Sequence, residues 1–118
     1  MAPVVDASTV IAGDSTMACY YGVLSGLPVH RPSGFLYPTG GGTLGYGLPA
    51  AIGAMLAEPE ARVLALLGDG GIMFTLSELA TAAQLGLGLP VLVAWTTAGT
   101  GSSATKCWIG ANRPSPWT

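Results

Sequence analysis

Two apolar runs in the second half of the chain limit its fold more than any other feature. Residues 62–67 (RVLALL) and 90–95 (PVLVAW) contain almost no polar side chains, a pattern typical of strands that are buried on both faces. The first run ends in Gly68-Asp69-Gly70-Gly71, which is a turn-forming sequence. Strands of this kind occur in parallel sheets that are covered by helices on both sides.

A helical pattern fills the interval between these two runs. Thr75-x-x-Glu78 matches a capping box at a helix start. The apolar residues that follow at helical spacing are Leu76, Leu79, Ala80, Ala83 and Leu85. A strand, a helix and a strand of these lengths form a βαβ unit, so the predicted class is α/β, a parallel sheet flanked by helices and incomplete in this chain.

The first half of the chain adds further elements to this unit. Residues 9–12 (TVIA) predict a strand that runs into a loop at 13–16 and then into a helix. Residues 34–45 (GFLYPTGGGTLG) predict turns throughout, and residues 48–56 predict a helix of small residues that ends before Glu58-Pro59.

Length and charge exclude several classes of protein. The chain has 118 residues, half of them hydrophobic and 8% charged, whereas a domain usually has about 150 residues and about 25% charged residues. We therefore expect at most one domain, or a piece of one, with much of its surface covered by other protein. A net charge of −2 provides no basic surface for nucleic acid.

The remaining signals favour a cytoplasmic protein. Pro and Gly interrupt the charge-free stretches 32–57 and 79–105, so neither predicts a membrane-spanning helix. No secretory signal is visible at the start of the chain. Cys19 and Cys107 lack metal-binding spacing, and the single His30 is expected at the surface.

Asp69 is the most informative candidate site residue. It follows a buried strand, at the edge of the sheet where ligands of α/β proteins bind. Its carboxylate suits Mg²⁺, and Gly70 and Gly71 allow backbone N–H groups to approach a phosphate. The alternative is an Asp that only caps a turn.

Two other polar or glycine-rich segments have weaker signals. Gly40-x-Gly42-x-x-Gly45 matches the dinucleotide fingerprint, but Pro38 interrupts the segment where a preceding strand is required. A Gly-rich loop close to a ligand or to neighbouring backbone is the better interpretation. Asp14, Ser15 and Thr16 favour a helix cap over an anion contact.

Two segments together resemble a known family. They are GDGGIMF followed by ELATA (68–74 and 78–82) and TLGYGLPAAIGA (43–54). Both are similar to markers of the thiamine diphosphate-dependent enzymes of the acetolactate synthase and 2-oxoacid decarboxylase type. The likeness runs from about residue 9 to residue 95, corresponds to the C-terminal cofactor-binding domain, and is especially near to guanidino-oxopentanoate decarboxylases in GFLYPTGGGTLGYGLPAA.

The resemblance implies roles for individual residues. Asp69 would bind the Mg²⁺ that bridges the two phosphates of thiamine diphosphate, with Gly70 and Gly71 beside them. Asp14 and Ser15 would lie in a loop that contacts the diphosphate. The Gly42 carbonyl would accept a hydrogen bond from the 4′-amino group of the cofactor. Leu44 would stand for the bulky apolar residue beneath the bent cofactor.

The resemblance also implies partners and missing parts. Members of this family act on 2-oxo acids, form homo-oligomers, and carry the catalytic Glu in a separate N-terminal domain, normally of a partner subunit. This chain has no such domain, so we expect no catalytic residue here and no activity from it alone.

The family motif that begins with Gly68-Asp69-Gly70 ends about 25 residues later, and there this chain departs from the family pattern. The family has two consecutive Asn, the second a metal ligand, where this chain has Thr96 and Thr97. The metal ligands implied here are Asp69, Thr97 and Gly99, and a Thr hydroxyl is a weaker, neutral ligand than the Asn carbonyl.

A single deleted nucleotide accounts for this departure. A gene reading TGG AAC AAC GGC GGG TAC encodes Trp-Asn-Asn-Gly-Gly-Tyr, a family-like continuation. Loss of one adenine from the first Asn codon gives Trp-Thr-Thr-Ala-Gly-Thr, the sequence at 95–100, and the same shift continues to Lys106-Cys107-Trp108-Ile109. We therefore divide the chain into residues 1–95, a partial cofactor-binding domain, and residues 96–118, an aberrant, frameshifted tail with no evolved fold.

Two other functions stay open at this stage. One is a non-enzymatic remnant or interaction module that keeps the fold but does not bind the cofactor. The other, a nicotinamide-binding domain, is disfavoured by the absence of a strand before the Gly-rich loop.

Overall fold

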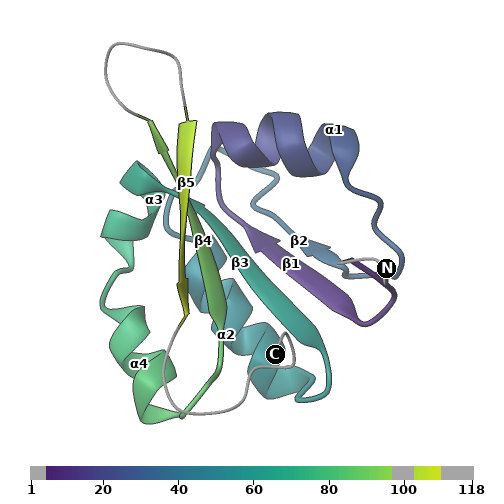
Figure 1. The fold of residues 1–118 in the computed structure, drawn as a ribbon, viewed down its shortest axis with the longest axis vertical. Coiled ribbons are helices and arrows are strands. Elements are labelled where there is room, and N and C mark those ends of the chain that lie inside the picture. Colours follow the sequence, from purple (N-terminus) through teal and green to yellow (C-terminus); the bar gives the residue numbers. More distant parts are fainter. Residues whose placement is uncertain (1–4, 97–102, 110–118) are drawn as a thin grey trace.

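The computed structural model describes residues 5–96 and 103–109. Its centre is a five-stranded sheet in the order β2-β1-β3-β4-β5 (Figure 1). The strands are β1 (Thr9–Gly13), β2 (Phe35–Leu36), β3 (Arg62–Gly68), β4 (Pro90–Thr96) and β5 (Ser103–Ile109). The first four are mutually parallel and β5 is antiparallel to β4, so the predicted α/β fold with a parallel sheet is confirmed.

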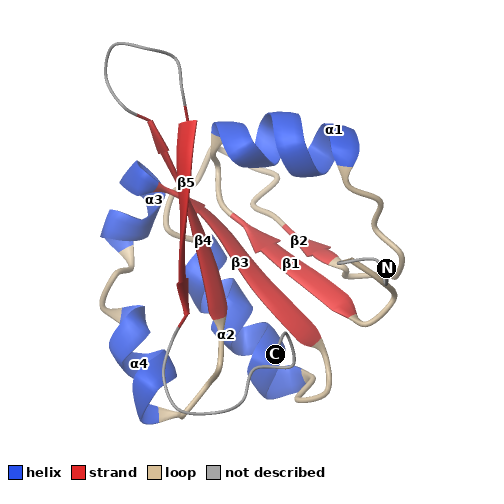
Figure 2. Cartoon of the chain, viewed as in Figure 1, coloured by secondary structure: helices blue, strands red, loops and turns tan. Residues whose placement is uncertain are grey.

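Helices connect the parallel strands. A continuous helical segment, η1 (Cys19–Val23, a π-helix) and α1 (Leu24–Gly26), follows β1. Helix α2 (Gly47–Ala57) leads from β2 to β3, and α3 (Asp69–Phe74) and α4 (Glu78–Gln84) lead from β3 to β4. Figure 2 shows α2, α3 and α4 on one side of the strands and α1 apart from them. In the described part of the chain no helix is long and apolar enough to span a membrane.

Alternating side chains of the strands separate two cores. Val63, Ala65 and Leu67 of β3 face α2 and α4, in a cluster that also contains Leu48 and Ile52. Complete burial of one such Leu contributes about 1.5–3 kcal/mol to stability. This larger core contains most of the buried residues of the domain.

The second core lies on the α1 side of the sheet. Its buried members are Ile11, Cys19, Val23 and Leu66. Burial raises the pKa of the Cys19 thiol to about 11, so Cys19 stays protonated at neutral pH. Because this core is small, the strands are covered unevenly on their two faces.

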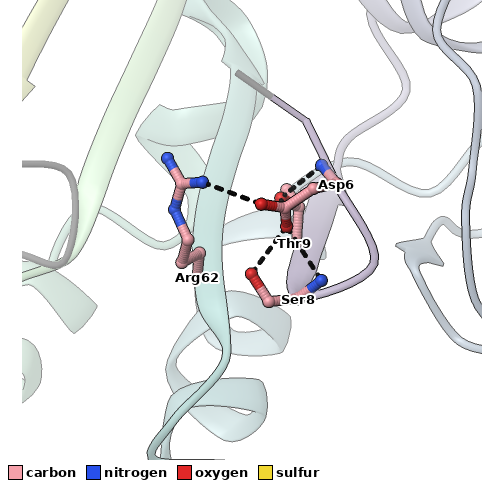
Figure 3. A network of polar contacts seen from close by, with 4 residues as sticks. All are labelled: Asp6, Ser8, Thr9 and Arg62. Carbon is pink, nitrogen blue, oxygen red and sulfur yellow. Dashed lines mark hydrogen bonds and ion pairs between the residues drawn. The ribbon is translucent and has the colours of Figure 1, made fainter. Parts of the chain in front are cut away.

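A polar network fixes the amino ends of β1 and β3 (Figure 3). The Asp6 carboxylate accepts hydrogen bonds from the Ser8 hydroxyl at 2.6 Å and the Ser8 N–H at 2.9 Å, and forms an ion pair with Arg62 at 3.3 Å. The two Ser8 hydrogen bonds lower the pKa of Asp6. The network aligns the first residues of the two strands, which pair as Thr9 with Arg62.

Several sequence expectations are wrong in detail. Phe35 and Leu36 form β2 where only turns are expected, because they pair with Ile11 and Ala12. Because β2 precedes the Gly-rich loop, the expected absence of a preceding strand no longer argues against a dinucleotide-binding motif. The dinucleotide fingerprint still fails, because α2 begins only at Gly47, after the third glycine of the motif.

The expected capping box is also wrong. Helix α4 begins at Glu78 after Ser77, and no side chain of the described residues caps it. Thr75 contributes its backbone carbonyl, which accepts from the Glu78 N–H at 2.9 Å. Residues 69–74 form the short helix α3, and α4 begins only at Glu78.

Part of the tail that is expected to have no evolved fold forms a strand. Residues Ser103–Ile109 form β5, in register with β4 from Pro90–Ile109 to Thr96–Ser103. Main-chain pairing at a sheet edge needs no particular side chains, so a segment of any origin can adopt it. The frameshift hypothesis concerns the origin of this segment and stays a prediction.

Two glycines of α2 provide a matched test of the packing. A Cβ on Gly47 would lie 2.5 Å from Leu67 Cδ2 and 3.2 Å from the Asp14 nitrogen, whereas a Cβ on Gly53 meets nothing within 4 Å. We expect Gly47→Ala to destabilise the fold by about 1–3 kcal/mol through overpacking. We expect Gly53→Ala to stabilise it by about 0.5–1 kcal/mol through helix propensity. Urea unfolding measures both, and a shift of both midpoints in the same direction would contradict this packing.

Candidate functional site

The candidate site lies at the carboxyl edge of the parallel strands. Asp14 follows β1 and Asp69 follows β3, and these strands are neighbours that pair as Gly13 with Leu66. The Gly-rich loop between β2 and α2 reaches the same edge, because Gly45 contacts Asp14. The fold therefore places together the residues that the sequence singled out on three separate segments.

Asp14 is the buried centre of this edge. Its side chain is 1% exposed. Oδ2 accepts the Gly45 N–H at 2.9 Å, and Oδ1 accepts the Ser15 N–H at 2.9 Å. The carboxylate thus attaches the Gly-rich loop to the end of β1, a role that differs from the simple helix cap considered from sequence.

Glycines make this close packing possible. A Cβ on Gly71 would lie 2.6 Å from Asp14 Oδ2, and a Cβ on Gly45 would lie 2.9 Å from Phe74 Cβ. Gly45 also has a φ of +86°, which disfavours any other residue. The start of α3 and the Gly-rich loop therefore converge on Asp14, and a side chain at either glycine would separate them.

Asp69 differs from Asp14 in its exposure. It is half-buried at the first position of α3, and its Oδ1 accepts the Gly70 N–H at 2.9 Å. This local hydrogen bond is the turn-capping geometry considered as the alternative. The second carboxylate oxygen has no hydrogen-bond partner among the described residues, and the space over Gly70 is open, since a Cβ there meets nothing within 4 Å.

The Gly-rich loop presents open backbone beside these carboxylates. Gly40, Gly41 and Gly42 are exposed, and a Cβ on any of them meets nothing within 4 Å. Gly41 and Gly42 have φ values of +70° and +60°. Leu44 is 43% exposed in the same loop. The loop thus has room for a ligand directly over its backbone.

Within residues 5–95, the charged side chains placed at this edge are the carboxylates of Asp14 and Asp69. Among residues 5–95 the Arg and Lys side chains are those of Arg31 and Arg62. Both lie at the amino ends of the strands, where Arg31 pairs with Glu58 at 2.7 Å and Arg62 pairs with Asp6. A phosphate at the carboxyl edge would therefore meet carboxylates and no basic side chain of this region, which disfavours it unless a cation is bound with it.

The metal ligand set predicted from sequence is only partly visible. Asp69 is placed, whereas Thr97 and Gly99 lie outside the described residues. Within the described residues no three His, Cys, Asp or Glu side chains come together as a metal cluster. Mg²⁺ commonly uses one or two carboxylates with phosphate oxygens and waters, and the half-buried Asp69 fits that donor set.

Sequence reasoning missed several contacts at this edge. Gly47 packs against the backbone at Asp14, and a Cβ on Gly68 would lie 3.0 Å from Thr16 Oγ1. The signal available was the clustering of glycines next to predicted strand ends, which indicates close backbone approach. His30 is exposed, as expected for a surface residue.

Comparison with known proteins identifies relatives for most of the chain. Residues 10–100 match the family described as thiamine pyrophosphate enzyme, C-terminal TPP binding domain. A probable 2-ketoarginine decarboxylase of Pseudomonas aeruginosa is 44% identical over 84 residues, which are 71% of this chain and 15% of that protein. The large subunit of acetolactate synthase isozyme 1 of Escherichia coli is 46% identical over 66 residues, 56% of this chain and 12% of that subunit.

A solved structure shares the fold. A protein of Mycobacterium smegmatis, described as a thiamin diphosphate-dependent enzyme, superposes with a TM-score of 0.68 and 25% sequence identity. The superposition covers 85% of this chain and 20% of that protein. This chain therefore spans less than a quarter of the length of each of these three relatives.

The two carboxylates of the site provide a test of its architecture. Asp14→Ala leaves the buried Gly45 N–H and the partly buried Ser15 N–H without their acceptor, and an unsatisfied buried donor costs about 1–3 kcal/mol. Asp69→Ala removes a half-buried carboxylate whose hydrogen bond is local, so we expect a loss below about 1 kcal/mol. Thermal unfolding compares the two variants, and equal losses of stability would contradict the assignment of Asp14 as the buried attachment point.

Proposed function

The chain belongs to the thiamine pyrophosphate-dependent enzymes, as part of their C-terminal TPP binding domain, and we propose that it binds thiamine diphosphate with Mg²⁺ at the carboxyl edge of its sheet. The observation that carries this proposal is the position of Asp69. Its carboxylate follows β3 beside the open backbone of Gly70 and shares that edge with the Gly-rich loop.

The geometry supports a role for Mg²⁺. A diphosphate has several negative charges, and Asp14 and Asp69 add two more at an edge without Arg or Lys among residues 5–95. A divalent cation held by Asp69 would neutralise this charge, and Asp14 is too buried to move towards the phosphates. Thr97 and Gly99 are the further ligands that we propose, the first as a weak neutral one.

The other residues of the edge would position the cofactor. When bound, thiamine diphosphate supplies a carbanion that adds to the carbonyl of a 2-oxo acid and accepts electrons on loss of CO₂. We propose that the Gly42 carbonyl accepts a hydrogen bond from the aminopyrimidine and that Leu44 supports the bent cofactor. Ser15, Gly70 and Gly71 would lie beside the diphosphate. The space over Gly70 and Gly42 is open, which leaves room for the contacts at these two residues.

The whole enzyme would act on 2-oxo acids as a decarboxylase or as an acetolactate synthase-like carboligase. The names of the two sequence relatives point to these reactions. We propose that the catalytic Glu comes from an N-terminal domain, of the same or a partner subunit, in a cytoplasmic homo-oligomer. Large apolar side chains are exposed at the carboxyl edge, and a partner domain that buries them would explain their exposure. They are Leu44, Met73, Phe74 and Trp95.

The tail belongs to the proposal as well. We propose that residues 96–118 are read out of frame, so that Thr96 and Thr97 replace two Asn. Nucleotide sequencing across the codons for residues 95–98 tests this directly. An intact reading frame in independent isolates would refute the frameshift.

The first functional prediction concerns the metal. Titration calorimetry of the chain with thiamine diphosphate is expected to show binding with Mg²⁺ and at least tenfold weaker binding without it, because only the metal offsets the carboxylate charge. Asp69→Ala should abolish the Mg²⁺-dependent binding. Glu60→Ala, which removes an exposed carboxylate near the amino ends of the strands, is the matched control and should leave the affinity unchanged.

Two results would argue against this site. Equal affinity with and without Mg²⁺ would show that the diphosphate does not depend on Asp69. Absence of binding under all conditions, by a chain that unfolds cooperatively, would favour the second candidate function. That candidate is a non-enzymatic remnant or interaction module, and the two Thr in place of Asn are the observation that favours it.

The second functional prediction concerns turnover. We expect the 118-residue chain to release no CO₂ from any 2-oxo acid above the rate with free cofactor, because the catalytic Glu that we propose belongs to an N-terminal domain that these 118 residues do not include. A coupled CO₂ assay with several 2-oxo acids measures this. Activity that persists through repurification and is lost in Asp69→Ala would show that the chain is a complete catalyst.

A further inference from the structure

Two buried hydroxyl groups lie at the carboxyl edge of the sheet without a partner. Ser15 Oγ and Thr75 Oγ1 are both shielded from solvent, and neither makes a hydrogen bond within the described residues. Ser15 follows Asp14 in the chain, and Thr75 lies against Gly45, whose N–H donates to Asp14. The two hydroxyls therefore flank the point where the Gly-rich loop is attached, and Thr75 has no role in the site described so far.

The backbone of Thr75 is fixed by its own hydrogen bonds. Thr75 follows the last residue of α3, and its N–H donates to the Ile72 carbonyl at 3.1 Å. Its carbonyl accepts the Glu78 N–H at 2.9 Å. Both main-chain polar groups of Thr75 are thus used, and the ends of α3 and α4 set the position of its side chain.

The Thr75 side chain packs against the end of the Gly-rich loop. A Cβ on Gly45 would lie 3.2 Å from Thr75 Cγ2 and 3.7 Å from Thr75 Oγ1. The hydroxyl is therefore next to the residue that follows Leu44. Because Oγ1 is buried, it can influence a ligand at the edge only through the loop.

A hydroxyl without a partner is a cost to the free chain. A buried polar group that makes no hydrogen bond destabilises a fold, whereas Val fills the same space with the same branching at Cβ. Packing alone therefore does not explain a Thr at position 75. Buried polar groups in folded proteins normally have partners, so we looked for a partner that a bound ligand would bring within reach.

The Gly-rich loop can provide that partner. Gly41 and Gly42 are exposed, have φ values of +70° and +60°, and have open space over their backbone. This part of the loop is free to adjust when a ligand occupies it. Since Thr75 already lies beside Gly45, a small adjustment brings a main-chain carbonyl of residues 43–45 within hydrogen-bond distance of the hydroxyl.

We propose that Thr75 is a positioning residue for thiamine diphosphate, whose hydroxyl donates a hydrogen bond to a main-chain carbonyl of residues 43–45 when the cofactor is bound. The inference rests on the proposed function, in which Gly42 and Leu44 contact the cofactor from the same loop. The hydrogen bond holds these two residues in their bound positions. Its effect is confined to the aminopyrimidine end of the cofactor, because the diphosphate lies beside Asp69.

Titration calorimetry of the full 118-residue chain with Mg²⁺ and two ligands tests this role. Thr75→Val keeps the shape of the side chain and removes the hydroxyl, so we expect it to raise the dissociation constant of thiamine diphosphate about tenfold, the effect of losing one hydrogen bond. Inorganic diphosphate has no aminopyrimidine, and its dissociation constant should not change. Thr75→Ser retains the hydroxyl and should restore the affinity for thiamine diphosphate. Thr81→Val, the same change at a half-buried position of α4, is the matched control and should leave both dissociation constants unchanged.

Urea unfolding without ligand separates positioning from folding. Because the hydroxyl has no partner in the free chain, Thr75→Val should leave the unfolding midpoint unchanged or raise it. A lower midpoint would show that the hydroxyl is already bonded in the free chain and would overturn the proposal.

The binding results also separate this role from the proposed function. A wild-type chain that binds no thiamine diphosphate would refute the proposed function and the role of Thr75 together. Wild-type binding that Thr75→Val leaves unchanged would refute the role of Thr75 alone. An equal loss of affinity for inorganic diphosphate would also overturn it, because the hydroxyl would then act on the phosphate end of the site.

Discussion

The buried carboxylate of Asp14 is the contact on which the carboxyl edge of the sheet depends. It accepts the Gly45 and Ser15 N–H groups and lies against the place where a Gly71 side chain would be. The end of β1, the Gly-rich loop and the start of α3 meet at this one side chain. A buried carboxylate without such donors would cost several kcal/mol, so the surrounding glycines and the Asp stabilise one another.

The sequence predicted the elements whose burial is unambiguous. The runs that became β3 and β4 are apolar throughout, and Val63, Ala65, Leu67 and Val91 are buried on the face covered by α2 and α4, whereas the other face of β4 is only partly covered. The helix at α2 has small residues because it packs closely on β1 and β3. Elements that depend on tertiary contacts were not predictable in the same way. Phe35 and Leu36 are too few to give a strand pattern, and they are extended because β1 provides hydrogen-bonding partners.

The candidate site was partly predictable for a similar reason. Asp69 stands out because glycines surround it after a buried strand, and that local pattern is visible without any structure. The role of Asp14 in attaching the Gly-rich loop is not visible in the sequence. Its partner Gly45 is 31 residues away, and only the loop conformation brings the two residues together. The family resemblance, confirmed by the match over residues 10–100, gave the identity of the ligand, which neither carboxylate reveals alone.

The separation of charge along the strands has a kinetic consequence. Arg31 and Arg62 are held at the amino ends by Glu58 and Asp6, so within residues 5–95 the carboxylates of Asp14 and Asp69 at the opposite end have no Arg or Lys beside them. The negative field of carboxylates accelerates encounters with small cations and slows encounters with polyanions, and dissolved salt weakens both effects within a Debye length of about 8 Å. For the proposed binding of thiamine diphosphate with Mg²⁺, such a field would favour arrival of the metal ion first, and the order of arrival would become less strict as the ionic strength rises.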